Sequence, residues 1–320
     1  MLNTRIYTYA LTSKFAQIAG LRKAINIVYF HGFTMHDGNY NLVQALHQAG
    51  LLEAFPHTVE EEILHKNYEP LDPVCAEKIL AKLQTLAPLR EPAPTIDPQG
   101  EVSYGKLITV SLDFGINSTD LKTSIQNFVE LLGERKTIFF AYSYGNLLAQ
   151  LFIQRLSLLP EAKISVFHRL IGAYGINGSL LPYDQNYSIL PEVAMKTAMN
   201  WTNSSFYAFL INMGMDKEKL NSARQRIKNT SEEVIKAQQQ ILIALVSAHD
   251  TFRTFLDNPL IMDKWRAFQA ATDDKIFPIE NLLKFGRAYK IPIRTVRGSH
   301  YITTTELIEM LCASTCYEEI

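Results

Sequence analysis

The chain has 320 residues, of which 47% are hydrophobic and 20% charged, and its formal net charge is −1. This balance is typical of a globular protein with a sizeable core. Because the chain has neither an overall basic charge nor a long run of like charges, it predicts no nucleic-acid partner and no attraction to an anionic membrane.

The spacing of the cysteines and the hydropathy of the chain indicate the expected cellular location. Cys75, Cys312 and Cys316 form no CxxC pair and no His/Cys cluster at zinc spacing, so we expect neither a disulfide framework nor a metal. The first residues lack the charged start and apolar stretch of a signal peptide, and no later apolar stretch reaches the roughly 18 residues of a membrane span. We therefore expect a cytoplasmic protein without a transmembrane segment.

Short apolar runs bounded by turn residues predict buried strands. Helical periodicities lie between them, the clearest after Ser118, where apolar residues recur on one face until Gly133. Strand alternating with helix predicts an α/β fold with a mostly parallel central sheet flanked by helices. The predicted strands are Ile25–Phe30, 107–112, Thr137–Tyr142, 166–173, Trp265–Ala271 and 291–296.

Two segments interrupt this alternation. The first, about 57–105, carries six prolines around one amphipathic stretch, which indicates an insertion, called the excursion below. The second, 177–263, shows no convincing strand but contains a capping-box pattern at 230–233 that opens an apolar helix, which predicts a helical cap. The expected organisation is a core formed by 1–176 and 264–320, with the cap inserted between them.

Ser143 stands where a predicted strand runs directly into a predicted helix. Such a strand–turn–helix holds a serine in a strained backbone conformation with its hydroxyl exposed, and the small residues Ala141 and Gly145 let strand and helix approach. Ala141 takes a place where glycine is usual. Taken alone, the pattern also suits a serine that only caps the helix. With the motifs below, it predicts a nucleophile.

The first predicted strand ends in His31, Gly32 and Phe33. The glycine lets the backbone turn so that the amide of Phe33 points inward. Together with the amide of Tyr144, at the start of the helix after the serine, this amide would stabilise the negative oxygen of a tetrahedral intermediate. The other interpretation is a plain turn.

Acidic and imidazole groups follow the last two predicted strands. Asp273 and Asp274 are adjacent, and we favour Asp274 because it stands four residues before Pro278, whereas Asp273 suits a turn or a cap. His300 follows the final strand in a Gly-Ser-His sequence. The chain order serine, aspartate, histidine favours His300 as the general base.

In the order and spacing of these motifs, the chain resembles the α/β-hydrolase superfamily over nearly its full length. The segment 107–118 adds to the resemblance, since similar members have a strand followed by Asp, Gly and Ser before the next helix. The resemblance implies an α/β-hydrolase fold, a cap after the strand that follows the nucleophile helix, and a triad of Ser143, His300 and Asp274. The excursion at 57–105 is longer than the family pattern.

A serine at this turn implies hydrolysis of an ester or thioester through an acyl-enzyme intermediate, with no cofactor. The cap is rich in apolar and aromatic residues, which favours a small-molecule substrate with a medium, largely apolar acyl group. The same residues equally suit simple packing of the cap helices. The candidate substrate-binding residues are His31, Gly32, Tyr142, Trp201 and Phe206.

Other functions remain open at the level of sequence. An acyltransferase would use the same acyl-enzyme, and a receptor would use the pocket without chemistry. Basic residues between Lys217 and Lys236, interspersed with glutamates, suit a solvated helix face. They also suit docking of an acidic acyl carrier protein, which would make the enzyme a carrier-protein esterase or thioesterase.

Overall fold

The computed structural model describes residues 3–21, 23–35, 42–53, 81, 95–96, 102–114, 119–161 and 163–312. One eight-stranded sheet has the order β10-β9-β8-β7-β2-β5-β1-β6, and β3 pairs with β4 in a separate ribbon. The strands are β1 (Asn3–Ala10), β2 (Ile25–Phe30), β3 (Thr95–Ile96), β4 (Val102–Ser103), β5 (Gly105–Leu112), β6 (Thr119–Asp120), β7 (Thr137–Tyr142), β8 (Leu170–Ile176), β9 (Trp265–Ala271) and β10 (Ile293–Val296).

The sheet is parallel from β5 to β10, and only β1 and β6 pair antiparallel. Every residue of the central strands β2 and β7 is buried, as expected for parallel strands that are covered by helices on both faces. The predicted α/β fold with a mostly parallel sheet is confirmed. Because the central strands are parallel, their carboxyl ends meet at one edge of the sheet.

Several strands differ from the sequence prediction, and β8 and β1 show why. The run 166–173 was predicted as one strand, but Ser165–Arg169 is the short helix α7, and β8 begins only at Leu170. Val166 and Phe167 are buried on one side of a helical turn, whereas His168 is exposed, so these apolar residues belong to a different element. β1 was not predicted, because its residues are mostly half-buried and polar. Most of the excursion at 57–105 and Ser118 lie outside the described residues.

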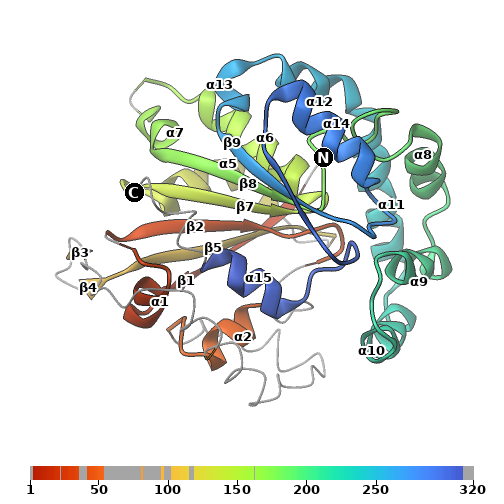
Figure 1. The fold of residues 1–320 in the computed structure, drawn as a ribbon, viewed down its shortest axis with the longest axis horizontal. Helices are drawn as coiled ribbons and strands as arrows, with labels where there is room; N and C mark the ends of the chain where they lie inside the picture. Colours follow the sequence, from red (N-terminus) through yellow and green to blue (C-terminus); the bar gives the residue numbers. More distant parts are fainter. Residues whose placement is uncertain are drawn as a thin grey trace.

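Helices cover both faces of the sheet (Figure 1). Helices α2 and α15 contact each other on one face, and α5, α6 and α13 lie on the other. The predicted apolar face after Ser118 is the buried side of α5. The helices of the core are α1 (Ser13–Ile18), α2 (Leu42–Gln48), α5 (Leu121–Leu132), α6 (Gly145–Ser157), α7 (Ser165–Arg169), α14 (Ile279–Tyr289) and α15 (Thr304–Leu311).

The chain between β8 and β9 is helical. In Figure 1 its helices α8 to α11 gather at the right, beyond the carboxyl ends of the strands. Helix α11 begins after Ser231, one residue later than the predicted capping box at 230–233; the Ser231 side chain accepts a hydrogen bond from the amide of Val234, which takes the place that a glutamate has in such a box. The helices are α8 (Pro191–Met199), α9 (Asn203–Asn212), α10 (Lys217–Lys228), α11 (Glu232–Ser247), α12 (His249–Leu256) and α13 (Pro259–Met262).

Candidate active site

Ser143 lies in the turn between β7 and α6. Its backbone is in the left-handed region, with φ of 54°, and its amide donates to the carbonyl oxygen of Ile176 at 2.8 Å. A Cβ atom added to Gly145 would lie 2.4 Å from the carbonyl oxygen of Phe30. Glycine is required there because the new helix starts directly against the neighbouring strand.

His300 joins Ser143 to Asp274. Its Nε2 lies 3.0 Å from Ser143 Oγ, and its Nδ1 lies 2.8 Å from Asp274 Oδ2. Both distances are those of hydrogen bonds. His300 has no exposed surface and Ser143 is 5% exposed. The structure thus brings together three side chains that the sequence analysis selected from separate strand ends.

Asp274, and not the adjacent Asp273, makes this contact. The second carboxylate oxygen of Asp274 accepts hydrogen bonds from the amides of Ile276 and Phe277, at 2.7 and 2.9 Å. Asp273 is exposed, and its amide donates to the carbonyl oxygen of Gly298. The turn amides hold the Asp274 carboxylate in place and satisfy the oxygen that does not face the histidine.

The imidazole of His300 contacts two aromatic rings. Phe277 stacks on it with ring centroids 5.7 Å apart, and Tyr142 lies at 5.4 Å. The Tyr142 hydroxyl donates to the carbonyl oxygen of His300 at 2.9 Å. Burial raises the pKa of this phenol well above its usual value, so it remains a neutral donor. These contacts restrict both the ring and the backbone of the histidine.

The two predicted oxyanion amides lie beside the serine turn. A Cβ atom on Gly32 would lie 3.3 Å from Ser143 Cβ, which shows how closely the backbone before Phe33 approaches the serine. No described residue accepts a hydrogen bond from the amide of Phe33 or of Tyr144. Buried amides are normally paired, so two amides without a partner at this place suit an incoming anion.

Comparison with known proteins rests on structure, since no family model and no curated protein matches the chain. A bromoperoxidase from Bacillus anthracis is 11% identical, covers 100% of this chain and 96% of its own, and has a TM-score of 0.57. A carboxylesterase structure from the thaumarchaeon Nitrososphaera gargenis is 11% identical, with coverage of 100% and 97% and a TM-score of 0.51. The chain has the α/β-hydrolase fold. The fold predicted from motif order is confirmed.

An aromatic cluster lies beside the site within this α/β-hydrolase fold, formed by Phe33, Trp201, Phe206 and Phe209. Trp201 contacts Phe33 with ring centroids 5.4 Å apart and Phe206 at 5.2 Å. Its indole nitrogen donates to Gln238 Oε1 on α11 at 2.9 Å, and both side chains are buried. Of the two residues singled out from sequence, Trp201 therefore contacts Phe33 directly, and Phe206 packs on the Trp201 ring.

One predicted residue, His31, and two residues that were not predicted, Asn177 and Gln238, also lie in this region. His31 is buried, with its ring edge against Tyr29 at 4.8 Å. Sequence reasoning did not select Asn177, which donates to the carbonyl oxygen of His300, or Gln238. An asparagine directly after a buried strand was the only signal for the first, and nothing in the sequence marks the second.

The residues that the structure describes show neither a metal cluster nor a membrane-spanning helix. They contain no group of three or more His, Cys, Asp and Glu side chains arranged to hold a metal ion. They also contain no helix of the length and apolarity that a membrane crossing requires.

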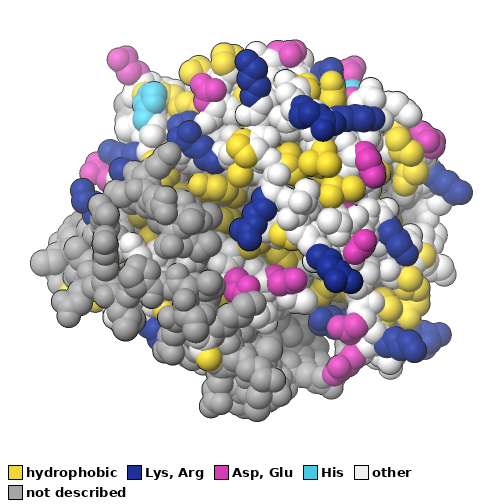
Figure 2. All heavy atoms as spheres, viewed as in Figure 1, with side chains coloured by type: hydrophobic (Ala, Val, Ile, Leu, Met, Phe, Trp, Pro, Cys, Tyr) yellow, Lys and Arg dark blue, Asp and Glu magenta, His cyan; other side chains and the backbone are white. Residues whose placement is uncertain are grey.

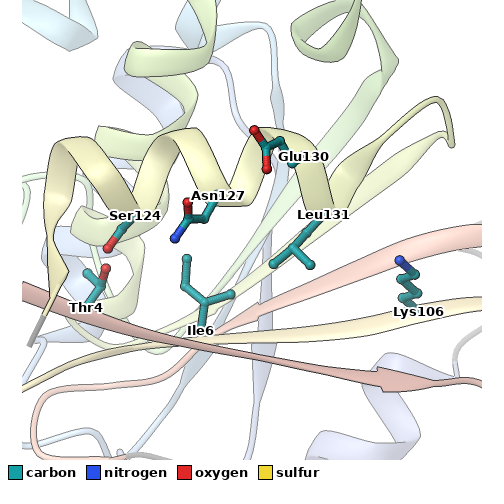
Figure 3. A pocket seen from close by; sticks show the side chains of 7 residues that line it. All are labelled: Thr4, Ile6, Lys106, Ser124, Asn127, Glu130 and Leu131. Carbon is teal, nitrogen blue, oxygen red and sulfur yellow. The ribbon is translucent and has the colours of Figure 1, made fainter.

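A pocket of about 460 Å³ lies between α5 and the strands β1 and β5 (Figure 3). No residue of the triad lines it. Its walls combine Lys106 and Glu130 with polar and apolar side chains, and Figure 3 shows Lys106 at one end of the lining residues and Glu130 on α5 nearer their middle. The lining residues are Thr4, Ile6, Lys106, Ser124, Asn127, Glu130 and Leu131.

Proposed function

We propose that the chain is a serine hydrolase that cleaves an ester or thioester of a medium, largely apolar acyl group through an acyl-enzyme intermediate. The observation that carries the proposal is the continuous hydrogen-bond chain from Ser143 through His300 to Asp274. A serine in a left-handed turn at the carboxyl edge of a parallel sheet, with a buried imidazole on its hydroxyl, is arranged for nucleophilic attack.

His300 acts as the general base in this mechanism. A carboxylate only accepts hydrogen bonds, so Asp274 requires the proton on Nδ1 of the imidazole and leaves the lone pair of Nε2 facing Ser143. As Ser143 Oγ attacks the acyl carbonyl carbon, its proton passes to Nε2. The Asp274 carboxylate then stabilises the imidazolium across 2.8 Å.

The tetrahedral intermediate places a negative charge on the former carbonyl oxygen. The amides of Phe33 and Tyr144 donate to this oxyanion, and each such donor contributes about 10²- to 10³-fold in rate. When the intermediate collapses, the bond to the alcohol or thiol breaks and the leaving group takes the proton from His300. Water, deprotonated by His300, attacks the acyl-enzyme, releases the carboxylic acid and restores Ser143.

The aromatic cluster supports an apolar acyl group. Trp201 packs on Phe33, the residue that supplies one proposed oxyanion amide. An acyl chain attached to Ser143 would therefore contact aromatic side chains first. Apolar walls with a few polar groups are usual in small-molecule sites. We propose that 177–263 forms a cap in which α8 to α11 lie over the core while α12 and α13 pack on α6. Trp201 and Phe206 of this cap would contact the acyl chain.

Labelling with a fluorophosphonate tests the nucleophile. We expect wild-type protein to be labelled, Ser143→Ala to be inert, and Ser157→Ala to be labelled at the wild-type rate. Ser157 is the matched control because it lies on the same helix α6 and its hydroxyl only donates to the carbonyl of Gln154. An unlabelled wild type, or undiminished labelling of Ser143→Ala, refutes the proposal.

Substrate class is tested with p-nitrophenyl esters and acyl thioesters of increasing chain length, with and without an alcohol acceptor. A hydrolase releases acid at a rate that the acceptor does not change. An acyltransferase instead forms the new ester at the expense of free acid. We expect the first outcome, with the highest kcat/KM at medium chain length.

A carrier protein is the second candidate partner, because α10 has five basic side chains against one acidic side chain. Lys219 is already paired with Asp216 at 2.9 Å. Figure 2 shows Lys and Arg side chains beside Asp and Glu side chains where Figure 1 places α10, so this face is mixed in charge. Arg224→Glu with Arg226→Glu should weaken turnover of a carrier-bound substrate and spare a small ester. Equal effects on both substrates contradict the idea.

A further inference from the structure

Asn177 directly follows β8, the strand between the serine-bearing β7 and the aspartate-bearing β9. Its backbone is left-handed, with φ of 43°, and the residue is 2% exposed. Asparagine is one of the few residues other than glycine that adopts this conformation readily. No step of the proposed reaction uses its side chain, so its burial at the site calls for another explanation.

The carboxamide of Asn177 joins the segments that carry the acid and the base. Its Oδ1 accepts from the amide of Ala271, at the end of β9, at 3.0 Å. Its Nδ2 donates to the carbonyl oxygen of His300 at 2.8 Å and to that of Ser299 at 3.4 Å. Because the partners are a backbone N–H on one side and backbone carbonyls on the other, only one orientation of the amide satisfies them.

The neighbours of Asn177 reach the nucleophile. Ile176, just before it, accepts the hydrogen bond from the amide of Ser143. A Cβ atom on Gly178, just after it, would lie 2.6 Å from the carbonyl oxygen of Ser143, so the two backbones are in direct contact. Residues 176–178 therefore touch the serine turn, the acid-bearing strand and the histidine loop within three consecutive positions.

We propose that Asn177 is a positioning residue that holds the imidazole of His300 between Asp274 and Ser143, an inference that rests on the proposed function. Asp274 holds the ring, while Asn177 and Tyr142 hold the backbone carbonyl of the same residue. A tilt of this backbone moves Nε2 relative to Ser143 Oγ. Displacement of a reacting group by about 1 Å costs on the order of 10²-fold in rate.

Only a carboxamide of this size can both accept a hydrogen bond from the Ala271 amide and donate one to the His300 carbonyl oxygen. Aspartate has nearly the same shape but no N–H, so one of its oxygens would face the His300 carbonyl oxygen without a proton between them. Glycine keeps the left-handed backbone and removes both side-chain hydrogen bonds. The two substitutions therefore remove the bridge in different ways.

The test compares Asn177→Asp and Asn177→Gly with Asn26→Asp. Asn26 is the matched control, because it is a buried asparagine that donates to a backbone carbonyl, that of Leu132, at 2.8 Å. It lies near the start of β2, at the opposite end of the strands from the triad. For each protein, kcat and KM for p-nitrophenyl butyrate, the rate of fluorophosphonate labelling and the thermal unfolding temperature are measured. The NMR signal of the proton between His300 Nδ1 and Asp274 is recorded as well.

We expect both Asn177 variants to lower kcat and the labelling rate by about 10- to 100-fold while KM changes by less than about threefold. Their Nδ1 proton signal should shift or broaden. Asn26→Asp should lose thermal stability but keep kcat within about threefold of wild type. If Asn177→Asp does not fold, Asn177→Gly decides the question.

Three results overturn the inference. One is a wild-type kcat in the folded Asn177 variants, and another is an equal loss of kcat in Asn26→Asp. In both cases normal labelling of the wild type shows that the proposed function stands while the positioning role falls. The third is a wild type that is not labelled at all, which overturns the proposed function and the inference with it.

Discussion

The triad and the aromatic cluster differ in how they are held. Each triad group is fixed by hydrogen bonds to particular atoms, such as those from the amides of Ile276 and Phe277 to Asp274. The aromatic cluster is held by ring contacts and a single side-chain hydrogen bond, between Trp201 and Gln238. Directional bonds fix one geometry, whereas apolar contacts tolerate changes of shape. We therefore expect substitutions in the triad to change the rate, and those in the cluster to change the preferred substrate.

The largest effect should follow loss of the base. His300→Gln removes the acceptor for the serine proton, and we expect kcat to fall by roughly 10⁴- to 10⁶-fold. The control is His168→Gln, since His168 is exposed on α7 and its loss should leave kcat unchanged. Steady-state kinetics with p-nitrophenyl butyrate measure both. A His300→Gln variant that keeps a tenth of the wild-type rate contradicts the assignment.

Asp274→Asn should have the next largest effect. An amide nitrogen facing Nδ1 favours the wrong tautomer of His300, and in a comparable triad this change costs about 10⁴-fold in kcat. Asp273→Asn is the matched control, because the neighbouring carboxylate is exposed and does not contact the histidine. If kcat falls by a similar factor in Asp274→Asn and Asp273→Asn, the two carboxylates act on His300 through their charge and not through direct contact.

Substitutions in the aromatic cluster should change the preference for acyl chain length. Trp201→Ala removes the ring that packs on Phe33, and we expect kcat/KM for an octanoyl ester to fall by about 10- to 200-fold. The acetyl ester, which does not reach this ring, should change by less than about threefold. Gln238→Leu frees the indole N–H without removing the ring and should give an intermediate loss. An equal loss for both esters would place the ring in the catalytic step.

The smallest effect concerns stability at the surface of the helical segment. Hydrogen bonds from the backbone and side chain of Lys219 lower the pKa of Asp216 from its ordinary 3.8. A lowered pKa stabilises the fold above the ordinary pKa, and the contribution is lost as the pH falls through the folded value. Asp216→Asn should cost no more than about 1 kcal/mol at pH 7, because the pair is exposed. Urea unfolding at pH 7 and at pH 3 checks that the difference between the proteins shrinks in acid.

The sequence predicts the elements whose signals are local. Runs such as Ile25–Phe30 and Thr137–Tyr142 match their strands in full, because parallel strands that are covered by helices on both faces bury every residue. β1 escapes prediction because it pairs antiparallel and mixes polar residues with half-buried ones. The run 166–173 misleads because the apolar residues of two adjacent elements, α7 and β8, are contiguous in the chain.

The same difference between local and long-range signals is seen within the site. Ser143, Asp274 and His300 stand at strand ends, where the order of motifs points to them. The roles of Asn177 and Gln238 depend on contacts with residues 123 and 37 positions away, and no local pattern encodes such a contact. Sequence patterns therefore mark the residues that we propose to react more readily than the residues that hold them in place.

The left-handed backbone at Ser143 limits which side chain this turn accepts. Threonine offers the same hydroxyl, but a branched side chain is strongly disfavoured at a positive φ. Cysteine has the unbranched shape of serine and meets no such barrier. The turn thus favours an unbranched side chain, so exchange of oxygen for sulfur costs this backbone less strain than addition of one methyl group.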